Sequence, residues 1–190
     1  MKIGIFGGSF NPPHKMHENI AVKLIEDKYV DRVIFVPTGD KYKYKSNMLS
    51  SSNRFEMVRL ITRKYDNLSV DNHEMVTNDT YTIETLDYFK NEYPKDDIYF
   101  ICGTDNLTYM DRWKYGYCIL SNYKVLVIKR ETDNIDKILE RFSDYRDNII
   151  VANIGISSIS STMIRENIDS YEDFLDEDVF KYIKDNHFYE

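Results

Sequence analysis

The chain has 190 residues, 42% of them apolar and 30% charged, a balance typical of one soluble globular domain with a sizeable core. Its formal net charge of −7 argues against non-specific binding to DNA or RNA, so an anionic ligand must meet local positive charge. There is no apolar run of membrane-spanning length and no signal-peptide pattern, so we expect a cytoplasmic protein without a membrane partner. We interpret Cys102 and Cys118, which lack metal-ligand spacing, as buried free thiols.

The first element is a short apolar run at residues 2–6, which predicts a buried strand that two glycines end. The helix expected next has one apolar face, formed by Ile20, Ala21, Leu24 and Ile25. Residues 32–36 predict a second buried strand, closed by Pro37. Strand, helix and strand in this order indicate a parallel βαβ unit.

The remaining chain continues the alternation after a polar loop at residues 38–52, and Asn53 is expected to cap the next helix with Glu56 as its capping-box partner. Further strands are expected at residues 68–70, 98–102, 124–128 and 149–152, and further helices at residues 81–93, 113–120, 134–144, 160–167 and 178–186. The strands are continuous apolar runs, as expected when helices cover both faces of a parallel sheet. We therefore predict an α/β fold, a Rossmann-like doubly wound and mostly parallel sheet of about five or six strands, in a single domain over residues 1–190.

In such sheets, ligands bind at the carboxyl ends of the strands near a topological switch point. Polar or glycine-rich segments follow four of the predicted strands, at residues 7–8, 37–39, 103–105 and 157–165. We expect these four segments to meet at one edge of the sheet.

The segment GGSFNPPHKMH at residues 7–17 combines a glycine-rich turn with a helix start that carries two histidines. Glycines let backbone N–H groups approach phosphate oxygens, and a helix N-terminus presents unpaired donors and the positive end of the dipole. The segment matches neither the dinucleotide fingerprint nor the P-loop. A lone histidine is usually a surface residue, but two in one helical turn after such a segment indicate a phosphate site.

This segment resembles the signature of the nucleotidyltransferase superfamily with the H-x-G-H motif, and its long form is similar to that of bacterial nicotinate mononucleotide adenylyltransferases. The segment ISSTMIR at residues 159–165 resembles the second signature of that family, I-S-S-T-x-I-R, which grips the ATP triphosphate there. Serine and threonine at this place are often only helix caps, yet Arg165 lies one turn inside, where a guanidinium helps to hold phosphate. The resemblance covers nearly the whole chain.

Two more segments carry the resemblance. TYTIETL at residues 80–86 is similar to the family's Y-T-x-x-T-L stretch, which implies that Thr82 lies near the pyridine ring. GTDNL at residues 103–107 and the Trp113-Lys114 pair resemble its G-x-D-N-L and W-K segments, which implies that Asp105 contacts the adenosine side and Trp113 stacks on the nicotinate ring. By itself a lone tryptophan is more often part of the core, and its polar neighbours leave both roles open.

The chain departs from the family pattern in two places. Met16 replaces the glycine between the histidines, and its side chain would crowd the nucleotide unless it points away along the helix. Residues 39–47 replace a P-P-H-K run, where Lys41, Lys43 and Lys45 either meet the mononucleotide phosphate or face solvent.

The resemblance implies adenylyl transfer from ATP to nicotinate mononucleotide, which gives deamido-NAD and pyrophosphate in NAD biosynthesis. The attacking phosphate oxygen is already ionised, so the reaction needs alignment and charge neutralisation rather than a general base. We assign His14 and His17 as catalytic groups that donate to the phosphates. The residues expected to bind ATP are Gly8, Ser9, Phe10, His14, His17, Gly103, Asp105, Ser160, Ser161, Thr162 and Arg165. Those expected to bind the acceptor are Lys45, Thr82 and Trp113.

Mg²⁺ is expected to bridge the phosphates, and the sequence identifies no dedicated protein ligand for it. Two alternatives stay open at this point. In the first, the acceptor is nicotinamide mononucleotide or another phosphorylated compound, such as a phosphopantetheine or a polyol phosphate. In the second, the protein binds nucleotides without turnover because of Met16. The sequence leaves the oligomeric state open.

Overall fold

The computed structural model describes residues 1–41, 48–77, 81–129, 133–155 and 159–190. The strands of this part are β1 (Lys2–Gly8), β2 (Arg32–Pro37), β3 (Leu68–Val70), β4 (Asp97–Gly103), β5 (Lys124–Ile128) and β6 (Ile149–Ala152). The α-helices are α1 (Lys15–Glu26), α2 (Ser51–Thr62), α3 (His73–Val76), α4 (Thr82–Glu92), α5 (Thr104–Thr108), α6 (Gly116–Asn122), α7 (Ile135–Arg141), α8 (Ser161–Glu166) and α9 (Glu177–Asp185). Short 3₁₀ helices are η1 (Met110–Arg112), η2 (Ser143–Asn148) and η3 (Asp169–Phe174).

The strands form one wholly parallel sheet in the order β3-β2-β1-β4-β5-β6, within the described part of the chain. The chain builds from β1 outward to β3, then crosses back to place β4 on the other side of β1. The strand order therefore reverses between β1 and β4, which makes this the topological switch point. The predicted Rossmann-like α/β fold is confirmed.

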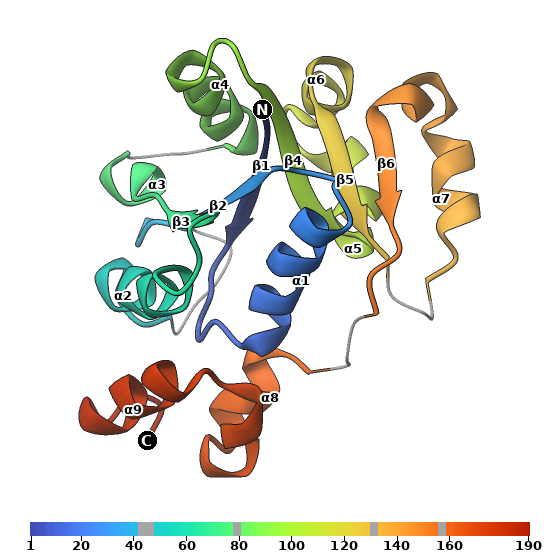
Figure 1. The fold of residues 1–190 in the computed structure, drawn as a ribbon. Helices are drawn as coiled ribbons and strands as arrows, with labels where there is room; N and C mark the ends of the chain where they lie inside the picture. Colours follow the sequence, from blue (N-terminus) through green and yellow to red (C-terminus); the bar gives the residue numbers. More distant parts are fainter. Residues whose placement is uncertain (42–47, 78–80, 130–132, 156–158) are drawn as a thin grey trace.

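Helices cover both faces of the sheet (Figure 1). On one face α1 packs Ile20, Ala21 and Leu24 against the strands. On the other face, α4 and α6 contribute Phe89 and Leu120 to a separate apolar cluster. The strands β1, β2, β4, β5 and β6 thus contribute to the apolar clusters on both faces, which explains their continuous apolar sequences.

A third apolar cluster lies at the carboxyl edge of the sheet and joins α2, α8 and α9. Its buried members include Met57 and Ile61 of α2, Ile164 of α8 and Ile183 of α9. Figure 1 shows α8 and α9 beyond the strand ends toward which the arrows point. Because of this cluster, the last part of the chain lies beside the loop that follows the first strand.

Several local expectations are wrong. Ser50, not Asn53, caps α2, and its side chain accepts the N–H of Asn53; both residue types are good caps, and the helix begins at Ser51. The helix expected at residues 113–120 begins later, as α6 at Gly116, and the short helix η1 lies before the expected range. Cys118 is exposed, whereas Cys102 is buried as expected. No helix among the described residues is long and apolar enough to cross a membrane.

Candidate active site

The loop between β1 and α1 begins later than the sequence suggests. Gly7 and Gly8 belong to β1, where Gly8 pairs with Pro37 of β2, and Phe10 is the residue with left-handed backbone, at φ 45°. The Phe10 ring lies over Gly8, because a Cβ on this glycine would come within 3.0 Å of the ring. Gly8 therefore provides room for the ring rather than a turn.

The Phe10 side chain belongs to the core, with 2% of its surface exposed. Its ring packs against Phe6 and Phe35 at centroid distances of 5.7 and 5.5 Å. Among the residues expected to bind ATP, Phe10 can therefore offer only its backbone. The adjoining loops are joined through Gly8, whose carbonyl oxygen accepts the N–H of Thr38 at 2.9 Å.

The two histidines lie against each other at the start of α1. His14 is the N-cap residue, and its backbone N–H donates to Nδ1 of His17 at 3.2 Å. The Nδ1 atom of His17 is thus an acceptor, so the neutral ring carries its proton on Nε2. The ring centroids are 3.9 Å apart.

His14 is 5% exposed, and its Nδ1 atom is buried without a hydrogen-bond partner among the described residues. Burial lowers the pKa of His14 from 6.5 to about 4, so its ring is neutral at pH 7. A buried polar atom without a partner carries a desolvation cost that a ligand can offset. The N-terminus of α1 therefore presents an unsatisfied ring atom beside unpaired backbone donors, where an anion would bind favourably.

The second signature is bonded directly to this loop. The Ser161 hydroxyl donates to the carbonyl oxygen of Pro12 at 2.8 Å. Arg165 donates from Nη1 to the carbonyl oxygen of Asn11 at 2.7 Å and from Nη2 to Oγ1 of Thr162 at 3.2 Å. Ser160 is the N-cap of α8, and its side chain accepts the N–H of Met163. The structure thus unites the two segments that the sequence places at opposite ends of the chain.

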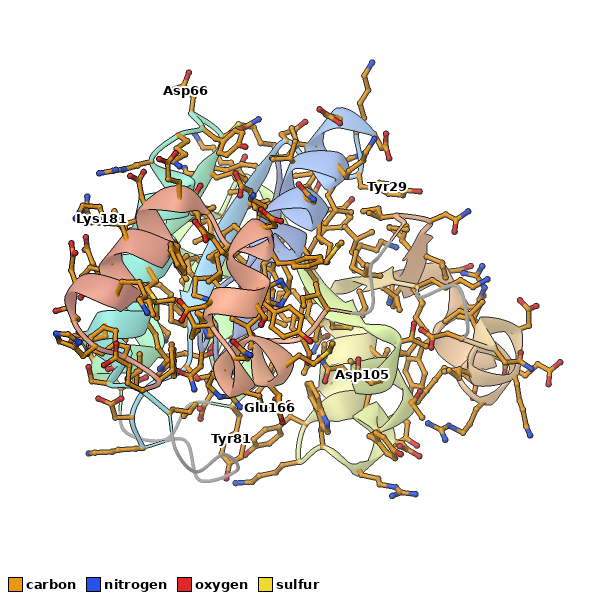
Figure 2. All side chains as sticks on the ribbon, turned by 90° about the horizontal axis from the view of Figure 1, so that it is seen from below. Tyr29, Asp66, Tyr81, Asp105, Glu166 and Lys181 are labelled. Atoms are coloured by element: carbon orange, nitrogen blue, oxygen red, sulfur yellow. The ribbon has the colours of Figure 1, made fainter. Side chains whose placement is uncertain are left out.

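The end of β4 completes this edge of the sheet on the other side of the switch point. Gly103 ends β4 and is the N-cap residue of α5. The Asp105 carboxylate lies against it, because a Cβ on Gly103 would come within 2.5 Å of Oδ1. Figure 2 is seen from below, with α8 and α9 in front of the sheet, and labels the exposed Asp105.

Comparisons with known proteins agree with this geometry. Residues 5–167 match the model of a family described as cytidylyltransferase-like. The chain is 36% identical over 197 residues to a probable nicotinate-nucleotide adenylyltransferase of Clostridium acetobutylicum, covering 99% of this chain and 98% of the relative. A relative of the same name from Carboxydothermus hydrogenoformans is 34% identical over 196 residues, with the same coverage. The chain belongs to the nicotinate-nucleotide adenylyltransferase family.

The fold is also that of a solved structure, the Plasmodium falciparum nicotinic acid mononucleotide adenylyltransferase complexed with NaAD. It matches with a TM-score of 0.83 at 20% identity, covering 99% of this chain and 97% of that one. The resemblance predicted from the sequence is therefore confirmed at the level of family and fold.

Two of the three residues predicted to bind the acceptor, Thr82 and Trp113, lie in the described part of the chain, after β3 and β4. Thr82 is the first residue of α4. Trp113 follows η1 and packs on Phe100 of β4, with ring centroids 6.2 Å apart, so it contributes to the core. Lys114 places Nζ 4.5 Å from the centroid of the Tyr81 ring, which connects the start of α4 to the Trp113 segment. Lys45 and Lys43 lie outside the described residues.

Met16, which replaces the family's glycine, is half-buried and packs against the apolar cluster of α1 that includes Phe10 and Ile20. This packing places the Met16 side chain on the core. We infer that the substitution is compatible with a working site, and a test is given below.

Arg54 is an important residue that the sequence interpretation missed. Its side chain is 0% exposed, and Nε donates to the carbonyl oxygen of Leu49 at 2.8 Å. Its Nη1 donates to the carbonyl oxygen of Ser9 at 2.8 Å and Nη2 to that of Thr38 at 2.6 Å. Asp40, the charged partner, lies 3.6 Å from Nη2. Arg54 thus ties the loop after β1 to the loop after β2 and to the lead-in of α2.

One sequence signal for Arg54 exists. It shares a helical face with the buried Met57, Val58 and Ile61 at spacings of three, four and seven residues. A charged residue on an apolar face needs a buried partner. The sequence does not say where that partner lies, and here the partners are backbone carbonyl oxygens.

Glu74 of the short helix α3 is a second ionisable group near these loops, and it is half-buried. Its Oε1 accepts the Thr85 hydroxyl at 2.8 Å. Burial raises the pKa of Glu74 from 4.5 to about 7. A Cβ on Gly39 would collide with the Glu74 carbonyl oxygen, so the loop after β2 packs closely on α3.

Proposed function

We propose that this protein transfers the adenylyl group of ATP to nicotinate mononucleotide, giving deamido-NAD and pyrophosphate for NAD biosynthesis. The observation that carries the proposal is the direct bonding of Arg165 and Ser161 to the loop that leads into His14 and His17. The names of the full-length relatives support the choice of acceptor. We propose that residues 1–190 form one nucleotidyltransferase domain.

In this mechanism, a phosphate oxygen of the mononucleotide attacks the α-phosphorus of ATP in line. The new oxygen–phosphorus bond forms as the bond to the bridging oxygen breaks, and pyrophosphate leaves with that oxygen. The attacking phosphate is already ionised, so no proton has to be removed. The protein's contribution is alignment and stabilisation of the charge that moves onto the leaving group.

The residues of the site divide this work. Backbone N–H groups of residues 8–10 and of the first turn of α1 cradle the phosphates. His17, with its proton on Nε2, and His14 donate to phosphate oxygens. Thr162 and Arg165 hold the triphosphate, and Asp105 lies on the adenosine side. The mononucleotide acceptor is bound, in this proposal, by Thr82, Trp113 and Lys45.

Mg²⁺ completes this proposal as a companion of ATP. The described residues include no group of three or more His, Cys, Asp or Glu side chains that could hold a metal ion. Because Mg²⁺ usually keeps several waters and takes one or two protein ligands, we propose that it reaches the site bound to the ATP phosphates. When bound, it would neutralise charge on the phosphates.

The test is a coupled pyrophosphate-release assay with ATP and two acceptors, nicotinate mononucleotide and nicotinamide mononucleotide. We expect turnover with the nicotinate form to exceed that with the amide, and no turnover with phosphopantetheine or a polyol phosphate and CTP. Binding of ATP without release of its pyrophosphate in the presence of any of these acceptors would reject the enzymatic function. Faster turnover of another acceptor would reassign the substrate.

The same assay tests the site. His17→Ala should lower kcat by about 100-fold or more, as loss of an oxyanion donor does, with little change in Tm. Turnover near that of the wild type would reject the assignment of His17. Trp113→Ala should raise the KM for the mononucleotide more than the KM for ATP, and equal effects would count against ring stacking.

A further inference from the structure

Asn11, in the middle of the predicted phosphate loop, receives hydrogen bonds from three distant segments. It is 3% exposed. Its Oδ1 accepts the hydroxyl of Tyr189 at 2.7 Å and the backbone N–H of Leu49 at 3.2 Å. Its carbonyl oxygen accepts from Arg165. The lead-in of α2, helix α8 and the C-terminal tail therefore all hold one residue of the loop.

The tail, residues 186–190, turns back after α9 in a conformation that directs Tyr189 to this loop. His187 and Tyr189 both have left-handed backbone, at φ 54° and 65°, which is unfavourable for residues other than glycine. The Phe188 N–H donates to the carbonyl oxygen of Ile183 at 3.1 Å, and its ring packs edge-on against Tyr182. Favourable contacts must offset this unfavourable backbone, and the part-buried hydrogen bond from Tyr189 to Asn11 is one of them.

The Tyr189 hydroxyl is well suited to act as a permanent donor. Burial raises the pKa of this hydroxyl above its ordinary value, although Arg165 and Arg54 oppose that effect. It therefore keeps its proton at neutral pH. The hydroxyl donates to Asn11, so it acts on the site through the loop.

We propose that Tyr189 is a positioning residue for adenylyl transfer: its hydroxyl orients the Asn11 amide and thereby holds the loop that leads into His14. The proposal rests on the proposed function of the same site. Without the bond, the loop keeps its contacts with Leu49 and Arg165 but samples more orientations. Alignment for in-line attack suffers more than ATP binding, which is shared among many contacts, so kcat should fall while KM changes little.

A purely structural role for Tyr189 is the competing explanation, because its ring also packs against the cluster of α2, α8 and α9. Tyr189→Phe keeps the ring and removes only the hydroxyl. Tyr182→Phe is the matched control, since the Tyr182 hydroxyl also donates to an asparagine Oδ1, that of Asn53 at 3.2 Å. Asn53 lies on α2 and outside the loop.

The first measurement is steady-state pyrophosphate release with ATP and nicotinate mononucleotide. We expect Tyr189→Phe to lower kcat by about tenfold, with the KM for ATP within about twofold of the wild type. Tyr182→Phe should keep both constants within about twofold. A kcat for Tyr189→Phe within twofold of the wild type, or an equal loss in Tyr182→Phe, would overturn the proposal.

A second measurement does not depend on turnover. Hydrogen exchange followed by mass spectrometry should show faster exchange of the backbone amides of residues 9–11 and 14 in Tyr189→Phe, since residues 12 and 13 are prolines without an N–H, and unchanged exchange there in Tyr182→Phe. Unchanged exchange in both variants would overturn the proposal even if kcat fell. An inactive wild-type protein with this exchange pattern would reject the proposed function and leave the positioning of the loop established.

Discussion

Arg165 donates a hydrogen bond from Nη1 to the backbone carbonyl oxygen of Asn11, although 154 positions of sequence separate the two residues. The same guanidinium donates from Nη2 to Thr162 in its own helix. Arg165 thus links the loop after β1 to the first turns of α8. In the proposed function, a residue that holds the triphosphate therefore also holds the loop that cradles it.

Arg165→Lys tests this double role. Lysine keeps the positive charge, but it lacks the planar fork that serves Asn11 and Thr162 together. We expect kcat/KM for ATP to fall by about tenfold or more. Arg63→Lys is the matched control, because Arg63 is exposed at the C-cap of α2 and pairs with Asp178 of α9 at 2.9 Å. Equal activity of the two variants would contradict the role of Arg165.

His14 should couple ATP binding to proton uptake. Burial holds its pKa at about 4 in the free protein, and a bound triphosphate should raise that pKa by stabilising the charged ring. ATP binding should therefore take up protons, and its affinity should rise as pH falls from about 7 toward 4. Calorimetric titration in two buffers of different ionisation enthalpy measures this uptake, and His14→Asn should reduce it. Uptake that is zero in the wild type would contradict the assignment.

The His14 ring also affects the stability of the protein without ATP. Between pH 6.5 and about 4 the unfolded chain protonates His14, whereas the folded protein keeps it neutral. The unfolded state then binds more protons, so the contribution of His14 to the free energy of unfolding falls as pH falls through this window. Glu74 has the opposite pH dependence, because its pKa is raised to about 7 in the folded protein. Between pH 4.5 and about 7 the folded protein binds more protons at Glu74 than the unfolded chain does, so the contribution of Glu74 to the free energy of unfolding falls as pH rises. Comparison of the wild type with His14→Asn separates the two effects.

Arg54→Met should destabilise the fold by about 3 kcal/mol or more. The substitution leaves the carbonyl oxygens of Ser9, Thr38 and Leu49 without their buried donor, and each such loss costs about 1–3 kcal/mol. Urea unfolding monitored by circular dichroism measures the change. Arg59→Met on the same helix is the control, because that exposed arginine pairs with the neighbouring Glu56 at the surface and its loss should cost less than about 1 kcal/mol. Similar losses in both variants would contradict the account of Arg54.

Met16→Gly restores the family's glycine between the histidines. We expect it to lower the free energy of unfolding by about 1–3 kcal/mol, because it removes apolar packing and places glycine in a helix. The kcat should stay within about twofold of the wild type. Asn19→Gly, at an exposed position of α1, measures the loss in the free energy of unfolding that comes from placing glycine in this helix without removing apolar packing. A tenfold rise of kcat in Met16→Gly would show that methionine impairs the site.

The sequence alone determined most of the strands of the sheet, and it predicted the chemistry of the edge where they end. The strands predicted at residues 68–70, 124–128 and 149–152 agree with β3, β5 and β6 at both ends. These strands are continuous apolar runs with polar flanks, so their signal is local. The two signature segments are also local strings of residues, and they were enough to predict the family and the phosphate site.

Only the tertiary structure decided how that site is held together. Arg54 bonds to carbonyl oxygens on three separate segments, and Tyr189 reaches Asn11 from the other end of the chain. The left-handed backbone at Phe10 likewise depends on the pocket that its ring fills. Such bonds depend on which loops the strand order brings to the switch point, and no local periodicity or propensity records that arrangement. Residue types predicted the chemistry, and long-range packing determined the geometry in which it can act.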